Sequence, residues 1–208
     1  KALGDAVAAE LTQSGPGTCA FRPCDVSQAQ QVQELVAYTV DTHGRLDCTV
    51  NNAGYLPKRS PIDEISTEDF QAVLGTNLIG VFSGCKYSLP HLRKSQGCLI
   101  NMSSILAVVG PEGSSIYTAT KGAITSLTKS LAIDEAKNGV RVNAVLPGNI
   151  RTDVGQRNLE SALPPERREE LSNLAQWIRR RGEPSEIGWT CVFLASPMAS
   201  YITGAEIH

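Results

Sequence analysis

The stretch SSIYTATKGA at residues 114–123 places Tyr117 and Lys121 four residues apart in a helical pattern. Residues at positions i and i+4 share one face of a helix, so the phenol and the ammonium would be neighbours. A free tyrosine has a pKa near ~10, but an adjacent cation favours the phenolate and lowers that pKa. The pair could then exchange a proton with a substrate oxygen. The pair can also be an ordinary exposed contact. The chain holds five tyrosines, so one of them is expected to have a lysine four residues later by chance.

The elements that must position this pair alternate along the chain. Helical patterns are expected over 1–13, 28–43, 66–92, 115–137 and a segment opened by EPSE at 183–186, and apolar strands over 18–24, 45–50, 98–102, 140–146 and near ITGAEI at 202–207. Strands separated by helices are typical of a parallel sheet, and strands without polar alternation indicate a sheet covered on both faces. The sequence predicts one α/β domain over residues 1–208 with a doubly wound sheet.

In such sheets, ligands bind beyond the carboxyl ends of the strands. Each of the first four predicted strands is followed there by small or polar residues, namely CDVS at 24–27, NNAG at 51–54, SS at 103–104 and PGNI at 147–150. These residues are also common in turns, so any one site is equally explained as a turn. Four sites at one edge favour a ligand.

The bulk properties narrow the class of protein. The 208 residues are 41% hydrophobic and 19% charged, with a formal net charge of −2. This composition is globular and gives no electrostatic footprint for nucleic acid or an anionic membrane. No apolar run approaches the ~20 residues of a membrane span, no signal peptide opens the chain, and six cysteines form no CxxC motif. We expect a cytoplasmic protein with reduced thiols.

Five phrases, in chain order, resemble the short-chain dehydrogenase/reductase family: NNAG (51–54), NLIG (77–80), NMSS (101–104), YTATK (117–121) and PGNI (147–150). Ser104 precedes Tyr117 by 13 residues and Lys121 follows it by four, which is the family spacing. The resemblance covers nearly the whole chain and implies a Rossmann-like fold, a nicotinamide cofactor and an alcohol or ketone substrate. The phrases GRLDCTVNNAG, LPHLRKSQG, GVRVNAVLPGNI and VFLAS narrow it to a branch of steroid and retinal dehydrogenases, which implies NAD, with NADP not excluded.

The resemblance also implies a catalytic set of four residues. Tyr117 would be the general acid or base, and Ser104 would hydrogen-bond the reacting oxygen, with Ser103 as the less favoured alternative. Lys121 would lower the pKa of Tyr117 and bind the nicotinamide ribose. Asn77 would hold a water that connects Lys121 to solvent, although outside this set an exposed or capping Asn is the simpler interpretation.

The cofactor contacts are carried over in the same way. Asp25 would accept from the adenine amino group, Val26 would pack on its ring, and Gly54 would admit the adenosine ribose. The full set implied is Asp25, Val26, Asn51, Asn52, Ala53, Gly54, Tyr117, Lys121, Pro147, Gly148, Ile150 and Thr152.

Other residues give weaker indications of a functional role. His43, His91 and His208 have no spacing for a metal or a triad, so no metal site is predicted. The run Arg179–Arg181 could grip a phosphate but is interpreted as solvated, and Asp134–Glu135 as an exposed helix end. By resemblance, residues 151–178 cover the substrate, and the helices 66–92 and 115–137 pair subunits into a homo-oligomer, a dimer or a tetramer.

One part of the family pattern has no counterpart here. The family opens with a strand and a TGxxxGIG-type turn that cradles the pyrophosphate, and no such turn precedes residue 18. We expect a truncated domain without the first βαβ unit. Either the chain is part of an active NAD(P)-dependent oxidoreductase, as its first residue Lys1 favours, or it is a non-catalytic member that acts as an interaction or dimerisation subunit.

Overall fold

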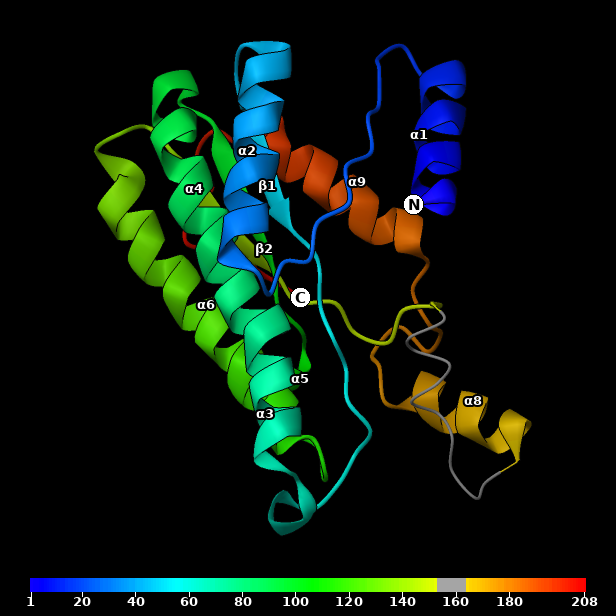
Figure 1. Ribbon diagram of the computed structural model, residues 1–208. Coiled ribbons are helices and arrows are strands. Elements are labelled where there is room, and N and C mark those ends of the chain that lie inside the picture. The colour runs from blue at the N-terminus through cyan, green and yellow to red at the C-terminus, as the bar shows by residue number, and fades with distance from the viewer. Residues whose placement is uncertain (153–163) are drawn as a thin grey trace.

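The computed structural model describes residues 1–152 and 164–208 (Figure 1). Within them, four strands form one parallel sheet in the order β1 (Cys48–Asn51), β2 (Cys98–Met102), β3 (Arg141–Val145) and β4 (Glu206–Ile207). The register pairs Asn51 with Asn101 and Asn101 with Ala144, so the three longer strands end together at one edge. The predicted doubly wound, Rossmann-like α/β fold is confirmed.

Helices cover both faces of this sheet. On one face, α4 (Gly80–Ser95) and α6 (Ser115–Ala136) contact the strands, and α2 (Ala29–His43) packs against α4. On the other face, α9 (Pro184–Ala195) contacts β2 and β3 (Figure 1). Other helical segments among the described residues are α1 (Ala2–Ser14), the short turn at Ile62–Glu64, α3 (Thr67–Leu74), α5 (Leu106–Val109), α8 (Pro165–Leu174) and the short turn at Pro197–Ala199.

The strand CLINM is buried at every position because both of its faces meet helices. Leu99 packs with Val81, Leu92 and Ile124 of α4 and α6, whereas Ile100 packs with Leu194 of α9. This explains why the strand contains no polar alternation. The core therefore fixes β2, and with it the residues that follow β2 at the edge.

The helix expected over 66–92 is continuous but changes its pitch. Ser66 caps α3 by accepting a hydrogen bond from the Asp69 amide at 3.0 Å. A π-helical turn, Gly75–Ile79, then joins α3 to α4. Such turns are rare and are frequent at functional sites. Here the turn holds Asn77, which is fully buried.

The strand predicted over 18–24 is wrong. These residues have no strand structure, although Cys24 and Val26 lie against β1 at one pocket. A β-strand is stable only when a neighbour accepts and donates its backbone hydrogen bonds. Within the described residues, β1 pairs with β2 alone, so it is an edge strand and Val50 is 43% exposed.

The exposed helix end predicted at Asp134–Glu135 is half wrong. Asp134 is exposed, but Glu135 is buried and accepts two hydrogen bonds from Arg93, at 2.6 and 2.8 Å. Asn138 donates a third at 2.9 Å. Glu135 therefore ties α6 to α4, and the arginine beside it holds the pKa of its carboxyl below the usual value.

Candidate functional site

The carboxyl ends of the strands converge on a pocket of about 200 Å³. Ser104 follows β2, Gly148 and Ile150 follow β3, and Tyr117 comes from the first turns of α6. The fold places these residues together because β2 and β3 end in register and α6 packs against both strands. A tyrosine, a serine and a strand-end turn thus face one small space, with Thr152 also in its lining.

The two neighbouring serines have different surroundings. Ser103 is turned toward α6, where its hydroxyl donates to the Lys121 carbonyl at 2.8 Å. Ser104 lines the pocket and accepts from the Leu106 amide at 3.2 Å. A hydrogen bond with Ser104 also favours the ionised form of Tyr117. The geometry therefore sets Ser104, rather than Ser103, beside the phenol.

The expected electrostatics of Tyr117 need a correction. Burial raises the pKa of Tyr117 above its ordinary value, and the bond from Ser104 offsets only part of the rise. Lys121 does lie close, with Nζ 5.6 Å from the centroid of the Tyr117 ring. Even so, the pKa of the phenol stays above its usual value, because burial is the largest influence on it.

Lys121 is buried, with 3% of its surface exposed, and its Nζ donates to the Met102 carbonyl at 2.8 Å. Burial lowers the pKa of this ammonium to about 8 because the interior disfavours the charged form. An ammonium has three N–H donors. The bond to Met102 uses one, so Lys121 retains donors for a ligand oxygen.

Asn77 clamps the chain that follows β1. Its amide accepts from the Tyr55 N–H at 2.7 Å and donates to the Tyr55 carbonyl at 2.9 Å. It also donates to the Thr120 hydroxyl at 3.3 Å, one residue before Lys121. A side chain added at Gly54 would lie 3.6 Å from both Asn77 Oδ1 and Lys121 Nζ. Asn77, Gly54 and Lys121 therefore form one contiguous group.

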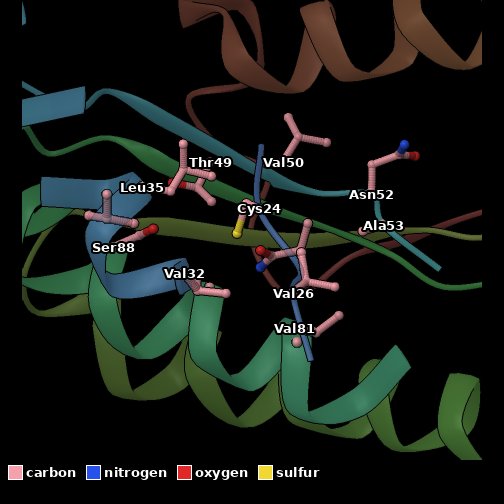
Figure 2. Close-up of a pocket in the computed structure, with 14 residues that line it drawn as sticks. Cys24, Val26, Val32, Leu35, Thr49, Val50, Asn52, Ala53, Val81 and Ser88 are labelled. Carbon is pink, nitrogen blue, oxygen red and sulfur yellow. The ribbon is translucent and has the colours of Figure 1, made fainter. Parts of the chain in front are cut away.

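A second pocket, of about 140 Å³, lies beside β1 (Figure 2). Val26, Val32 and Val81 line this pocket, and Asn52 and Ala53 line it where β1 ends (Figure 2). These apolar walls suit a flat ring. Asp25 is exposed, and its carboxylate accepts from the Ser27 amide at 3.0 Å and the Ser27 hydroxyl at 2.7 Å. Asp25 thus shapes the turn that leads into α2.

Asn51 faces inward from the same strand end. Its amide donates to Asn101 Oδ1 at 2.8 Å, and Asn101 donates to the Thr128 hydroxyl at 2.9 Å. This chain of polar groups links β1, β2 and α6. Its continuation through Asn101 was missed, although one asparagine within the apolar run CLINM could have indicated it.

The loop after β3 is held by a residue that sequence analysis misjudged. Arg181 is buried, with 4% exposed, and its Nη2 donates to the Ile150 carbonyl at 2.8 Å. The interpretation of Arg179–Arg181 as a solvated run is therefore wrong for its last member. Arg180 instead pairs with Glu186 at the start of α9, at 2.6 Å. Pro147 accepts from the Ile105 amide at 3.1 Å.

The predicted site residues thus occupy two adjoining regions of one sheet edge. Val26, Asn51, Asn52 and Ala53 line the pocket beside β1, while Ser104, Tyr117, Gly148, Ile150 and Thr152 line the pocket beside β3. Residues 153–163, part of the segment expected to cover the substrate, lie outside the described residues. Across the described residues, no group of three metal-binding side chains occurs and no helix is long and apolar enough to span a membrane.

Comparisons with known proteins agree with this geometry. Residues 1–208 match the family adh_short_C2, described as enoyl-(acyl carrier protein) reductase. The chain is 44% identical over 207 residues to L-fucose dehydrogenase of Bos taurus, covering 100% of this chain and 74% of the relative. It is 34% identical over 203 residues to meso-2,3-butanediol dehydrogenase of Serratia marcescens, covering 98% of this chain and 77% of the relative.

Among solved structures, NAD⁺-bound xylitol dehydrogenase superposes with a TM-score of 0.90 at 27% identity, covering 98% of this chain and 82% of that one. These three relatives are named after fucose, butanediol and xylitol, so they do not single out the branch of steroid and retinal dehydrogenases. The family match over the whole chain, together with the fold, shows that this chain belongs to the short-chain dehydrogenase/reductase family of oxidoreductases.

Proposed function

We propose that the chain carries the catalytic and nicotinamide-binding residues of an NAD(P)-dependent dehydrogenase that interconverts a secondary alcohol and a ketone. The observation that carries this proposal is the pocket shared by Ser104 and Tyr117, with Lys121 one helical turn away on α6. The fold supplies a proton donor, a hydrogen-bond donor and a cation at the strand edge where such sheets bind ligands.

The residues present fit a dinucleotide laid along this edge. The apolar pocket at Val26 and Val81 would take the adenine, and Asn52 and Ala53 would lie beside the adenosine. Gly54 lies next to Lys121, whose remaining donors would hold the nicotinamide ribose. Gly148, Ile150 and Thr152 would adjoin the nicotinamide. When bound, the cofactor would accept or supply the hydride.

The proton is handled by this chain. During reduction, Tyr117 would donate its phenolic proton to the ketone oxygen, and Ser104 would donate a hydrogen bond to the same oxygen. During oxidation the phenolate would take the hydroxyl proton. Burial keeps Tyr117 protonated in the free chain, which favours the reductive role. The positive ring of an oxidised cofactor would lower its pKa for the oxidative one.

The proposal covers two cofactors and two classes of substrate. NAD is the expected cofactor, and NADP is open, since a relative in structure, ElxO, is described with NADP bound and another with NAD⁺. A steroid or retinoid is one substrate class. A sugar or a small diol is the other, favoured by the names of the relatives.

A second proposal, a non-catalytic subunit, draws on exposed apolar side chains. Phe82 on α4 is 51% exposed and Ile133 on α6 is 78% exposed, on the helices expected to pair subunits into a dimer or tetramer.

The two proposals make opposite predictions for Tyr117. If the chain is catalytic, Tyr117→Phe should reduce turnover at least ~10²-fold, the scale of general acid–base catalysis, with little change in NADH affinity. A chain that binds no NAD(P)H and turns over no alcohol, while remaining folded, would favour the subunit.

A further inference from the structure

We propose that Arg181 is a specificity-determining residue and that the pocket beside Tyr117 takes a small hydroxy or oxo acid, with its carboxylate on the guanidinium of Arg181. This proposal rests on the proposed function in one respect, namely that the pocket lined by Ser104 and Tyr117 binds the substrate. Arg181 lines the pocket together with Ser104 and Tyr117, so one ligand can reach all three residues.

The first observation is a buried charge that the protein neutralises poorly. Arg181 is 4% exposed, and a guanidinium stays protonated under all ordinary conditions. Within the described residues, its ion-pair partner is Glu169, whose carboxylate lies 3.7 Å from Nη1 and whose side chain is 42% exposed. Burying a cation is costly unless a close, hydrogen-bonded anion compensates it. This pairing is long, so Arg181 can accept a better anion.

The second observation is an unused donor. Nη2 is satisfied by the Ile150 carbonyl at 2.8 Å, but Nε is buried and has no hydrogen-bond partner among the described residues. Buried polar atoms without partners are rare in folded proteins. A ligand carboxylate that replaced the long Glu169 contact would add a charge-assisted bond to the guanidinium, which is stronger than a bond to a neutral group.

The third observation concerns the neighbouring residues, which separate Arg181 from an ordinary structural arginine. Arg180, next in the chain, makes two short bonds to Glu186, at 2.6 and 2.7 Å, and is complete without a ligand. Arg179 is exposed. Of the three, only Arg181 combines burial, an unpaired donor and a place in the pocket wall. A pocket of about 200 Å³ also suits a small acid.

The test compares two ligands that differ in charge alone. Isothermal titration of the chain, with NAD(P)H present, would use 3-hydroxybutyrate and its uncharged isostere 3-hydroxybutanamide. We expect the carboxylate to bind at least ~10-fold more tightly. Arg181→Met should remove that preference, and Arg181→Lys should retain part of it, because a lysine keeps the charge but not the planar fork.

Arg179→Met is the matched control, since it removes an exposed charge two residues away and should leave both affinities unchanged. If the unsubstituted chain binds the amide as well as the carboxylate, the proposal is overturned, whatever Arg181→Met does to folding. An equal loss in Arg179→Met would overturn it too. If the charge preference is absent but the chain oxidises uncharged butan-2-ol in a Tyr117-dependent way, the carboxylate site at Arg181 fails and the proposed dehydrogenase function stands. If the charge preference is present but no alcohol is turned over, the carboxylate site stands and the proposed function fails.

Discussion

The Nζ atom of Lys121 lies 5.6 Å from the centre of the Tyr117 ring and donates at 2.8 Å to the carbonyl of Met102. The ammonium is thus held between α6 and the end of β2, beside the phenol and away from water. This arrangement disfavours ionisation of both side chains in the free chain, in different directions: burial raises the pKa of Tyr117 and lowers that of Lys121 to about 8.

The depressed pKa of Lys121 should appear in the pH dependence of stability. Between pH about 8 and ~10.4 the unfolded chain binds the lysine proton more tightly than the folded chain, so the free energy of unfolding should rise with pH. A shift of this size corresponds to roughly 3 kcal/mol at most. Urea unfolding should show the rise in the original chain and a flatter profile in Lys121→Met. Lys94→Met, which removes an exposed lysine, should keep the slope, and a steep slope in Lys121→Met would contradict the prediction.

The raised pKa of Tyr117 should separate the two directions of the reaction. Reduction needs the protonated phenol and should stay fast until the pH approaches that pKa, whereas oxidation needs the phenolate and should increase with pH. Profiles of kcat in both directions measure this. Ser104→Ala removes the hydrogen bond that favours the phenolate, so the limb of its residual oxidation should move to higher pH. A limb that moves to lower pH would be inconsistent with this role of Ser104.

Gly84 should be required by the polar chain at β1. A side chain added there would come within 2.0 Å of Asn51 Oδ1, so Asn51 would have to leave Asn101. We expect Gly84→Ala to lower the free energy of unfolding by about 1–3 kcal/mol, the range for overpacking. Gly188 is at an exposed position of α9, where a new side chain meets nothing within 4 Å, so Gly188→Ala should be neutral or stabilising. Equal stability of the two variants in urea would show that the close approach is unimportant.

The pair of Glu135 and Arg93 should contribute to acid stability. The folded pKa of Glu135 is depressed, so its contribution is present above the ordinary carboxyl pKa and is lost as the pH falls through the folded value. At neutral pH, Glu135→Gln should lose about 1.5–3 kcal/mol, the range for a hydrogen bond to a charged group. Arg93 is 45% exposed, so its charge can reach water. Asp134→Asn, at an exposed carboxyl, is the control, and similar losses in both variants would argue against a specific pair.

The local sequence pattern was sufficient to predict an element where that element depends on its own residues and on the segments packed directly against it. The strand CLINM was predicted with its observed bounds because two covered faces force a continuous apolar run. Ser104 was favoured over Ser103 by family spacing, and the structure gives a reason, since Ser103 bonds to the backbone of α6. Spacing could not predict the pKa of Tyr117, because burial by distant segments sets it.

Predictions from the local sequence pattern failed where the structure of a segment depends on residues far away in the chain. Residues 18–24 have the composition of a strand, but a strand needs a hydrogen-bonding neighbour that composition cannot supply. Arg181 lies in a run of three arginines, and its burial follows only from the way the loop after β3 packs against the segment before α9. Glu135 was misjudged for the same reason, since its partner Arg93 is 42 residues away.

The most direct test of the central claim is to follow deuterium from the carbinol carbon of a labelled secondary alcohol onto the nicotinamide, with NAD and NADP in turn. We expect the label to appear on the reduced cofactor with the original chain and to be absent with Tyr117→Phe, while the variant still binds NADH. A folded chain that binds the cofactor but never transfers the label would rule out hydride transfer, and transfer that persists in Tyr117→Phe would rule out Tyr117 as the acid and base.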